Sequence, residues 1–284
     1  MQTVQSKDGT RIAIETSGSG RPLVLVNGAV NDKGTVAPLR KLLEPNFTVV
    51  AYDRRGRGES GDTEPYAPER EIEDLKSVLD FAGGADAFLF GHSSGAILAL
   101  RTVMSGVSVR ALAVNEPPYI LNGTRPRPDS KRIASGLRNL IANGDSEGAL
   151  TLFVTEAVGL PPQALQGMKA TPLWAPMIRL AHTTPYDTEM AGDSELPEAL
   201  LRAIKIPTLV LHGTASFPWI GETASAMAKL IPDAEFKLLE KQRHSPAPDV
   251  LAPALIQFFS SKAPKDHTRA VDAGLMSNDR RRAP

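Results

Sequence analysis

The sequence predicts an α/β fold: a mostly parallel central sheet flanked by helices, with an α-helical segment inserted between two of its strands. Apolar runs without alternation, such as residues 22–26, are typical of strands that are buried on both faces. Helical patterns lie between the runs. Residues 119–205 hold helical patterns only, punctuated by proline and glycine. The first two features predict the sheet and its covering helices, and the third predicts the insertion.

The length and composition are those of a soluble globular protein. The chain has 284 residues, enough for one large α/β domain or two ordinary ones, and length alone does not decide between them. Hydrophobic residues make up 42% of the sequence and charged residues 23%. The 32 basic residues offset the 32 acidic ones, so no global field favours nucleic acid or an anionic membrane. We therefore expect neither of these as a partner.

The sequence contains no cysteine, which excludes disulfides, thiolate catalysis and cysteine-based metal sites. Residues 1–9 lack the apolar core of a signal peptide, and no uninterrupted apolar run is long enough to cross a bilayer. We therefore expect a cytoplasmic protein. We also expect it to be a monomer or a homodimer and to use no metal and no cofactor.

The chain is expected to begin with an antiparallel hairpin at the sheet edge. Residues 3–6 and 12–16 flank Asp8-Gly9, a dipeptide that is typical of a hairpin turn. The apolar runs 22–26 and 47–52 predict the next two strands.

The second of these strands runs into Asp53-Arg54-Arg55-Gly56-Arg57-Gly58-Glu59-Ser60. We expect Asp53 to accept hydrogen bonds from backbone N–H groups of its own turn, as Asp commonly does. Arg54, Arg55 and Arg57 are interpreted as solvated loop arginines, because surface charges are the norm. A grip on a substrate carboxylate is the alternative for these arginines.

A helix is predicted from Pro68 to Gly83-Gly84, because apolar residues recur on one of its faces. Residues 109–115 predict a further strand. Pro117-Pro118 must take the chain out of the sheet, since two prolines in succession do not continue a strand.

The segment that follows contains three patterns of helical spacing. They run through residues 133–141, 150–157 and 173–181. The sheet resumes at residues 206–213, ends with a strand at residues 235–239, and is followed by a helix through residues 250–259.

The central motif is Gly91-His92-Ser93-Ser94-Gly95, between the apolar run 88–90 and a helical pattern. Strand, sharp turn and helix place Ser93 on a tight turn, where small residues are needed on both sides. The alternative is a connecting turn in which Ser93 only caps the following helix.

This motif resembles the nucleophile elbow of the α/β-hydrolase superfamily, and the turn from Asp53 to Ser60 is similar to a second motif of that family. The resemblance covers about residues 3–259. It implies Ser93 as the nucleophile and the N–H groups of Ala29 and Ser94 as the oxyanion hole. Asn27, two residues before Ala29, stands where the family usually has His, which is a departure from the family pattern.

The resemblance also implies the domain organisation. Residues 1–118 and 206–262 would form the hydrolase core, and residues 119–205 a helical lid that shapes the pocket. His182, Tyr186 and Asp187 are possible pocket-lining residues, although ordinary lid structure is the favoured interpretation. Residues 263–284 are polar with little to pack, which predicts a mobile tail.

A serine hydroxyl needs a neighbouring base, and His is suited to that role because it titrates near neutrality. The family places its catalytic His in the loop before the final helix, and His244 matches that position among the five histidines.

The acid is where the sequence departs most from the family. After the strand 206–213 the family usually carries an Asp, but this sequence has Ser216 in that run. Glu116, at the end of the strand expected beside the elbow strand, is the best candidate for holding His244. Asp187 and Asp53 are the fallbacks, and a Glu116 paired with a lid arginine is the structural alternative.

These residues predict a serine hydrolase of carboxylic esters, lactones or similar acyl compounds of small organic molecules. Ser93 argues against epoxide hydrolases and haloalkane dehalogenases of similar fold, which use an Asp nucleophile. A cofactor-free lyase or cyclase is one alternative, and a hydrolase-like ligand-binding module is another.

Overall fold

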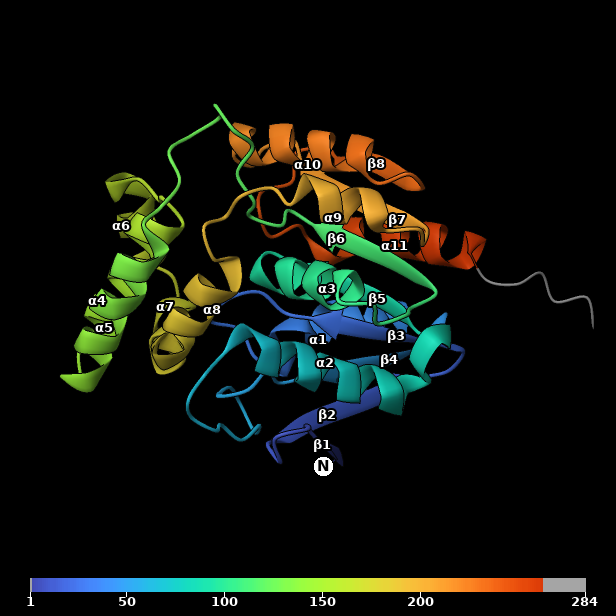
Figure 1. Ribbon diagram of the computed structural model, residues 1–284, viewed down its shortest axis with the longest axis horizontal. Coiled ribbons are helices and arrows are strands. Elements are labelled where there is room, and N and C mark those ends of the chain that lie inside the picture. The colour runs from blue at the N-terminus through green and yellow to red at the C-terminus, as the bar shows by residue number, and fades with distance from the viewer. Residues whose placement is uncertain (1, 263–284) are drawn as a thin grey trace, which may run out of the picture.

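Eight strands form one sheet in the order β1-β2-β4-β3-β5-β6-β7-β8 in the computed structural model, which describes residues 2–262 (Figure 1). The strands are β1 (Gln2–Gln5), β2 (Arg11–Gly18), β3 (Arg21–Val26), β4 (Phe47–Tyr52), β5 (Phe88–His92), β6 (Ala111–Asn115), β7 (Thr208–Gly213) and β8 (Ala234–Leu239). β1, β2 and β4 pair antiparallel, and all pairs from β4 to β8 are parallel. The predicted edge hairpin is confirmed.

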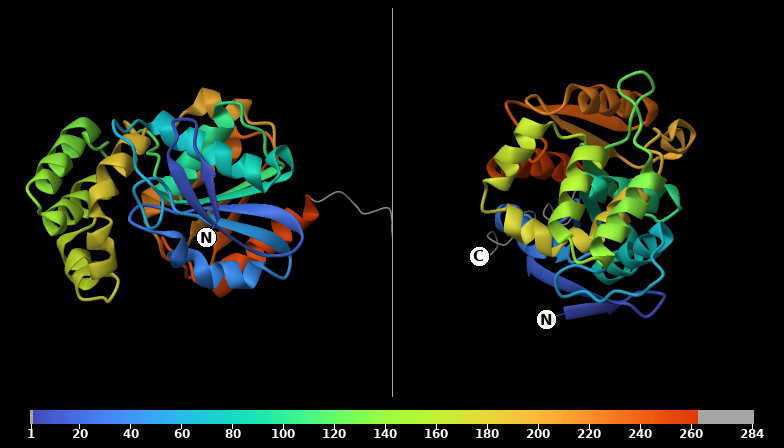
Figure 2. Two further views of the ribbon diagram at one scale, coloured as in Figure 1. Left: turned by 90° about the horizontal axis from the view of Figure 1, so that it is seen from below. Right: turned by 90° about the vertical axis from the view of Figure 1, so that its left-hand side faces the viewer.

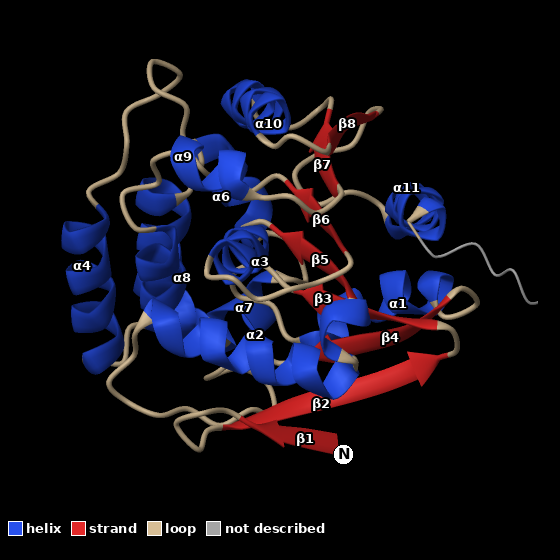
Figure 3. Ribbon diagram, turned by 45° about the vertical axis from the view of Figure 1, so that its right-hand side comes forward, coloured by secondary structure: helices blue, strands red, loops and turns tan. Residues whose placement is uncertain are grey.

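Helices cover both faces of this sheet (Figure 3). Five helices do so: α1 (Ala37–Leu43), α2 (Pro68–Ala82), α3 (Ser94–Met104), α10 (Pro218–Leu230) and α11 (Pro248–Ser261). One apolar cluster packs α2, α3 and α10 on one face, and a second packs α1 and α11 on the other. Burial on both faces explains why the central strands are apolar without alternation. The predicted fold class is confirmed.

The local signals for α2 act as expected. Pro68 stands at its first turn, where a missing N–H costs nothing, and Gly83 ends the helix with φ +114°. Leu75, Val78 and Leu79 lie on its buried face. This predicted helix is confirmed.

The segment between β6 and β7 is helical and stands beside the core (Figure 2). It comprises α4 (Ser130–Ala142), α5 (Ser146–Leu152), the π-helical turn η3 (Phe153–Ala157), α6 (Pro162–Lys169), α7 (Trp174–Arg179), the short η4 (Ala181–Thr183), α8 (Thr184–Ala191) and α9 (Glu198–Ala203). A third apolar cluster joins α4, α5, η3, α6, α7 and η4 to Val30 of the core, whereas α8 and α9 contribute Met190 and Leu201 to the first cluster. A β-bridge between Ile120 and Glu195 closes the base of the excursion.

The three predicted helical patterns correspond to α4, to α5 with η3, and to α7 with η4. The patterns predicted neither α6 nor α9, and they did not predict α8. Six of its eight residues are buried, Thr184 and Asp187 among them, so it has no apolar stripe facing one side.

Among residues 2–262, no helix is long and apolar enough to cross a membrane. The predicted tail at residues 263–284 lies outside the described residues.

Candidate active site

The turn between β5 and α3 holds Ser93 in an uncommon backbone conformation, with φ 55° and ψ −125°. Such conformations cost about 1–3 kcal/mol and persist only where the surroundings enforce them. Close packing does so here: a Cβ on Gly95 would lie 2.3 Å from the carbonyl oxygen of Asn27, and one on Gly91 would lie 2.6 Å from that of Gly95. The Ser93 hydroxyl makes no helix-capping hydrogen bond, so the capping alternative is not observed.

Ser93, His244 and Glu116 lie in one row of hydrogen bonds. His244 Nε2 is 3.0 Å from Ser93 Oγ, and His244 Nδ1 is 2.6 Å from Glu116 Oε2. Ser93 is partly exposed and the His244 side chain is 30% exposed, whereas Glu116 is fully buried. The structure thus brings together three predicted site residues, with solvent access at the serine end of the row.

The Glu116 carboxylate is held by donors on both oxygens. The N–H of Gly213 donates to Oε1 at 2.9 Å, and the hydroxyl of Ser216 donates to Oε2 at 2.7 Å. Burial opposes ionisation, but the hydrogen bonds from His244, Gly213 and Ser216 outweigh it and lower the Glu116 pKa. Ser216 therefore binds the carboxylate from the position where the family usually carries one.

His212 is a further neighbour of Glu116 that the sequence did not indicate. Its Nδ1 lies 2.9 Å from Glu116 Oε1, although the two groups are poorly aligned for a hydrogen bond. Among the described residues no arginine comes within ion-pair distance of Glu116. The alternative pairing with a lid arginine is therefore absent from residues 2–262.

His92 packs beside His244 and contacts Asn115. Its ring centroid is 4.9 Å from that of His244, and its Nδ1 is 2.9 Å from Asn115 Nδ2. Burial and the nearby His244 lower the His92 pKa to about 3, so the ring is neutral at pH 7. The Asn115 amide also donates to the carbonyl of His244 at 3.2 Å. These contacts fix the backbone of His244.

The turn after β3 lies against Ser93. A Cβ on Gly28 would be only 3.1 Å from the Cβ of Ser93. The N–H groups of Ala29 and Ser94 have no hydrogen-bond acceptor among residues 2–262, so both remain available to a ligand. Asn27 donates through Nδ2 to the carbonyl of Asp32 at 2.7 Å, which shapes this turn.

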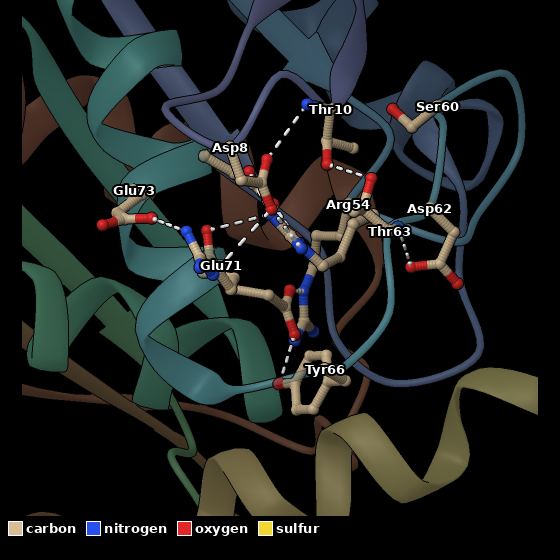
Figure 4. Close-up of polar contacts among 12 residues, drawn as sticks. Asp8, Thr10, Arg54, Ser60, Asp62, Thr63, Tyr66, Glu71 and Glu73 are labelled. Atoms are coloured by element: carbon tan, nitrogen blue, oxygen red, sulfur yellow. Dashed lines mark hydrogen bonds and ion pairs between the residues drawn. The ribbon is translucent and has the colours of Figure 1, made fainter.

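The interpretation of Arg54, Arg55 and Arg57 as solvated is wrong, because all three side chains are at most 1% exposed. Arg54 pairs with Glu71, with the closest atoms 2.6 Å apart (Figure 4). Arg55 pairs with Asp74 and Asp8. Arg54 and Arg57 both pair with Asp187. Internal carboxylates thus occupy these guanidinium groups, which leaves none of the three free to bind a substrate carboxylate.

The two fallback acids lie in other interactions. Asp53 accepts from the N–H groups of Lys33 and Glu59 at 2.7 and 2.9 Å and from Lys33 Nζ at 2.7 Å. Asp187 accepts from Arg54, Arg57 and Ser94. The hydrogen bonds of the described residues connect neither carboxylate to His244.

The other suggested pocket-lining residues contact the loop after β4. His182 Nε2 is 2.7 Å from the carbonyl oxygen of Gly56, and the Tyr186 hydroxyl donates to Asp62 at 2.8 Å.

In residues 2–262, no group of three or more acidic or His side chains is arranged to hold a metal ion.

The buried carboxylates Glu71 and Asp187 predict a dependence of stability on acid pH. Burial raises their pKa values, but paired arginines outweigh it and hold both below the ordinary 4.5 for Glu and 3.8 for Asp. A lowered folded-state pKa adds stability above the unfolded-state pKa, and this stability is lost as pH falls through the folded-state value. We expect the melting temperature to fall steeply with decreasing pH below about pH 4.5, in thermal melts at constant ionic strength.

The matched variant for this prediction is Glu71→Gln. It should melt at a lower temperature than wild type at pH 7 but lose less on going from pH 5 to pH 3, since it has one ionised carboxylate fewer to protonate. Equal losses in the two proteins would contradict the assignment.

The chain is similar to known proteins over most of its length. The chain matches the "Alpha/beta hydrolase family" over residues 23–254. It is 25% identical over 259 residues to a non-heme haloperoxidase of Rhodococcus erythropolis, covering 86% of this chain and 93% of that protein. An alpha/beta hydrolase structure from Sphaerobacter thermophilus is 51% identical with a TM-score of 0.86, covering 91% of this chain and all of that one.

A thermophilic esterase from Thermogutta terrifontis has a TM-score of 0.71 and 23% identity, covering 93% of this chain and 99% of its own. At that identity the likeness is one of fold. Together with the sheet order, these matches confirm the expected α/β-hydrolase fold.

Proposed function

The chain belongs to the alpha/beta hydrolase family, and on that premise we propose that it is a serine hydrolase of carboxylic esters, lactones or related acyl compounds. The observation that carries this proposal is the row of hydrogen bonds from Ser93 through His244 to Glu116. Each group has the character its role needs: a partly exposed hydroxyl, an imidazole and a buried carboxylate with a lowered pKa.

In the proposed reaction Ser93 Oγ attacks the acyl carbon while His244 Nε2 takes the hydroxyl proton. Glu116 keeps His244 in the required tautomer and stabilises the imidazolium that forms. The tetrahedral intermediate then expels the alcohol, which receives the proton from His244, and leaves an acyl-Ser93. Water activated by His244 attacks this ester, releasing the carboxylic acid and restoring Ser93.

The developing negative charge would be bound by the N–H groups of Ala29 and Ser94. Both lie on the turns that meet at Ser93, and neither has an acceptor among the described residues. Loss of one such donor typically costs about 10²- to 10³-fold in kcat.

Residues 119–205 are proposed to act as a lid over the site. Their apolar cluster includes Val30, which follows Ala29 in the proposed oxyanion turn. A cover of this kind favours small or medium organic substrates over polymers.

A second acyl acceptor is proposed for testing, because relatives of this chain are named non-heme haloperoxidase and non-heme chloroperoxidase. Hydrogen peroxide in place of water would attack the acyl-Ser93 and release a peracid, with the same proton transfers through His244. Peracid formation from an ester and hydrogen peroxide is the measurement.

The experiment that tests the function combines a fluorophosphonate probe with a panel of p-nitrophenyl esters of increasing chain length. We expect the probe's mass on the peptide containing Ser93, together with turnover of at least one ester. Labelling without turnover of any ester would replace the hydrolase by a lyase or cyclase. Absence of labelling would favour a ligand-binding module.

A further inference from the structure

A buried ionic cluster links the helical segment to the proposed oxyanion hole. It consists of Arg54 and Arg57, from the turn after β4, and Asp187, from α8. Arg54 Nη1 is 3.0 Å from Asp187 Oδ1, and Arg57 Nη2 is 2.8 Å from Asp187 Oδ2. All three side chains are at most 1% exposed. Charges so deeply buried are costly unless they are paired and hydrogen-bonded.

The cluster reaches the first proposed oxyanion donor through the side chain of Ser94. Ser94 Oγ donates to Asp187 Oδ1 at 2.7 Å and accepts from Arg54 Nη1 at 3.0 Å. Ser94 follows the nucleophile directly and begins α3. Its hydroxyl is thus fixed from two sides, which restricts the orientation of the residue whose N–H is free.

The cluster reaches the second proposed donor through the backbone of the turn after β3. Arg57 Nη1 donates to the carbonyl of Gly28 at 2.9 Å. That carbonyl and the N–H of Ala29 belong to the same peptide group, and in a planar trans peptide the two point in opposite directions. Because Arg57 holds the carbonyl on the side of the cluster, the N–H of Ala29 faces away from it.

Arg54, which binds the Ser94 hydroxyl, also contacts the carbonyl of Asn27, in the peptide group before that of Gly28. Arg54 Nη1 lies 3.3 Å from the carbonyl oxygen of Asn27, while its Nε and Nη2 are bound by Glu71 at 2.6 and 2.9 Å. Tyr66 donates to Glu71 at 2.8 Å beside it (Figure 4). All three nitrogen atoms of the Arg54 guanidinium therefore have hydrogen-bond acceptors within the protein.

We propose that Asp187 is a positioning residue that orients both oxyanion-hole donors, Ser94 through its hydroxyl and Ala29 through Arg57 and the Gly28 carbonyl. This inference rests on the proposed function. Since Asp187 comes from α8 and the arginines from the core, docking of the helical segment is a condition for a competent oxyanion hole. Burial opposes ionisation of Asp187, but the arginines and Ser94 lower its pKa, so the carboxylate is charged at neutral pH.

The chain offers a matched control in Asp74. Its carboxylate is also buried and pairs with Arg55, an arginine of the same turn, at 2.7 Å. The other contacts of Arg55 are with Asp8 and the carbonyl of Arg70, and none reaches Asn27, Gly28 or Ser94. Asp74→Asn therefore removes a comparable buried charge without touching the proposed donors.

The experiment compares Asp187→Asn with Asp74→Asn in the full-length protein. We expect Asp187→Asn to lower kcat about 10- to 100-fold, less than the 10²- to 10³-fold for loss of a whole donor. Its KM for the best ester should stay within about 3-fold, because the donors act on the transition state. Asp74→Asn should lower the melting temperature but keep kcat within about 2-fold. Similar melting losses with kcat near wild type in both variants would reduce the cluster to a structural role.

Two further measurements keep the inference testable if Asp187→Asn does not fold or if the chain is not a hydrolase. Ser94→Ala leaves the arginine–aspartate pairs in place and should lower kcat several-fold; an unchanged kcat would overturn the path through Ser94. The amide chemical shift of Ala29, measured by NMR, requires no activity and should move in Asp187→Asn but not in Asp74→Asn; an unchanged shift in Asp187→Asn would overturn the path through Arg57. Failure of the proposed function would instead appear as turnover retained in Ser93→Ala.

Discussion

Replacing Ser93 with Ala is expected to lower kcat by about 10⁵- to 10⁶-fold, the scale seen when a catalytic serine is removed from a hydrolase that works through a triad. The physical reason is that no acyl-enzyme forms without the hydroxyl. The oxyanion-hole donors Ala29 and Ser94 and the substrate-binding surface remain, and they account for the residual rate. The melting temperature should stay close to that of wild type, since the partly exposed hydroxyl makes no capping hydrogen bond in the turn and loses only its contact with His244 Nε2. Steady-state turnover of the best ester and the mass of the probe-treated protein are the measurements.

The control for this variant is Ser105→Ala, near the other end of the elbow helix. Ser105 is exposed and donates only to the carbonyl of Thr102. It should leave turnover and probe labelling unchanged. Probe mass on a serine other than Ser93, or full turnover in Ser93→Ala, would reject the proposed nucleophile.

Replacing Glu116 with Gln is expected to lower kcat by about 10²- to 10⁴-fold while the protein stays folded. The amide cannot stabilise the imidazolium of His244. It also meets conflicting partners, because Gly213 N–H and the Ser216 hydroxyl both donate to this side chain. One of them would face an NH₂ group in place of an oxygen, so a modest loss of melting temperature should accompany the loss of turnover.

A rescue variant makes this prediction specific. Ser216 Oγ is 2.7 Å from Glu116 Oε2, which in turn is 2.6 Å from His244 Nδ1. An aspartate at that position would bring a carboxylate close to the imidazole, so Ser216→Asp in the Glu116→Gln background should recover about 10-fold or more of kcat. A Glu116→Gln enzyme within a few-fold of wild type, beside an inactive Asp53→Asn, would move the acid's role to Asp53.

The features that could be predicted from the sequence are those encoded by residues close together along the chain. The strand, tight turn and helix around Ser93 lie within about a dozen consecutive residues, and Gly91 and Gly95 are there because backbones approach too closely for any side chain. The buried strands were readable because burial on both faces demands continuous apolar runs. The ends of α2 were readable because Pro68 and Gly83 act on the backbone within one turn.

The position of the site was only partly readable. Ser93 could be proposed from its local motif, His244 from the resemblance to the family, and Glu116 from its place at the end of the strand expected beside the elbow strand. The detailed surroundings of Glu116 could not. Ser216 and Gly213 lie about a hundred residues away along the chain, and only the pairing of β6 with β7 brings them to its carboxylate.

The burial and pairing of Arg54 and Arg57 depend on the tertiary structure. An arginine in a turn is expected to be solvated unless a buried partner is known. The partner here, Asp187, lies 133 residues from Arg54 and 130 from Arg57 along the chain, so the sequence did not indicate it. Its helix shows no amphipathic stripe because it is buried on nearly all sides. Burial of a charge depends on a partner carboxylate arriving from another element, and this is a property of the packed chain that no local pattern carries.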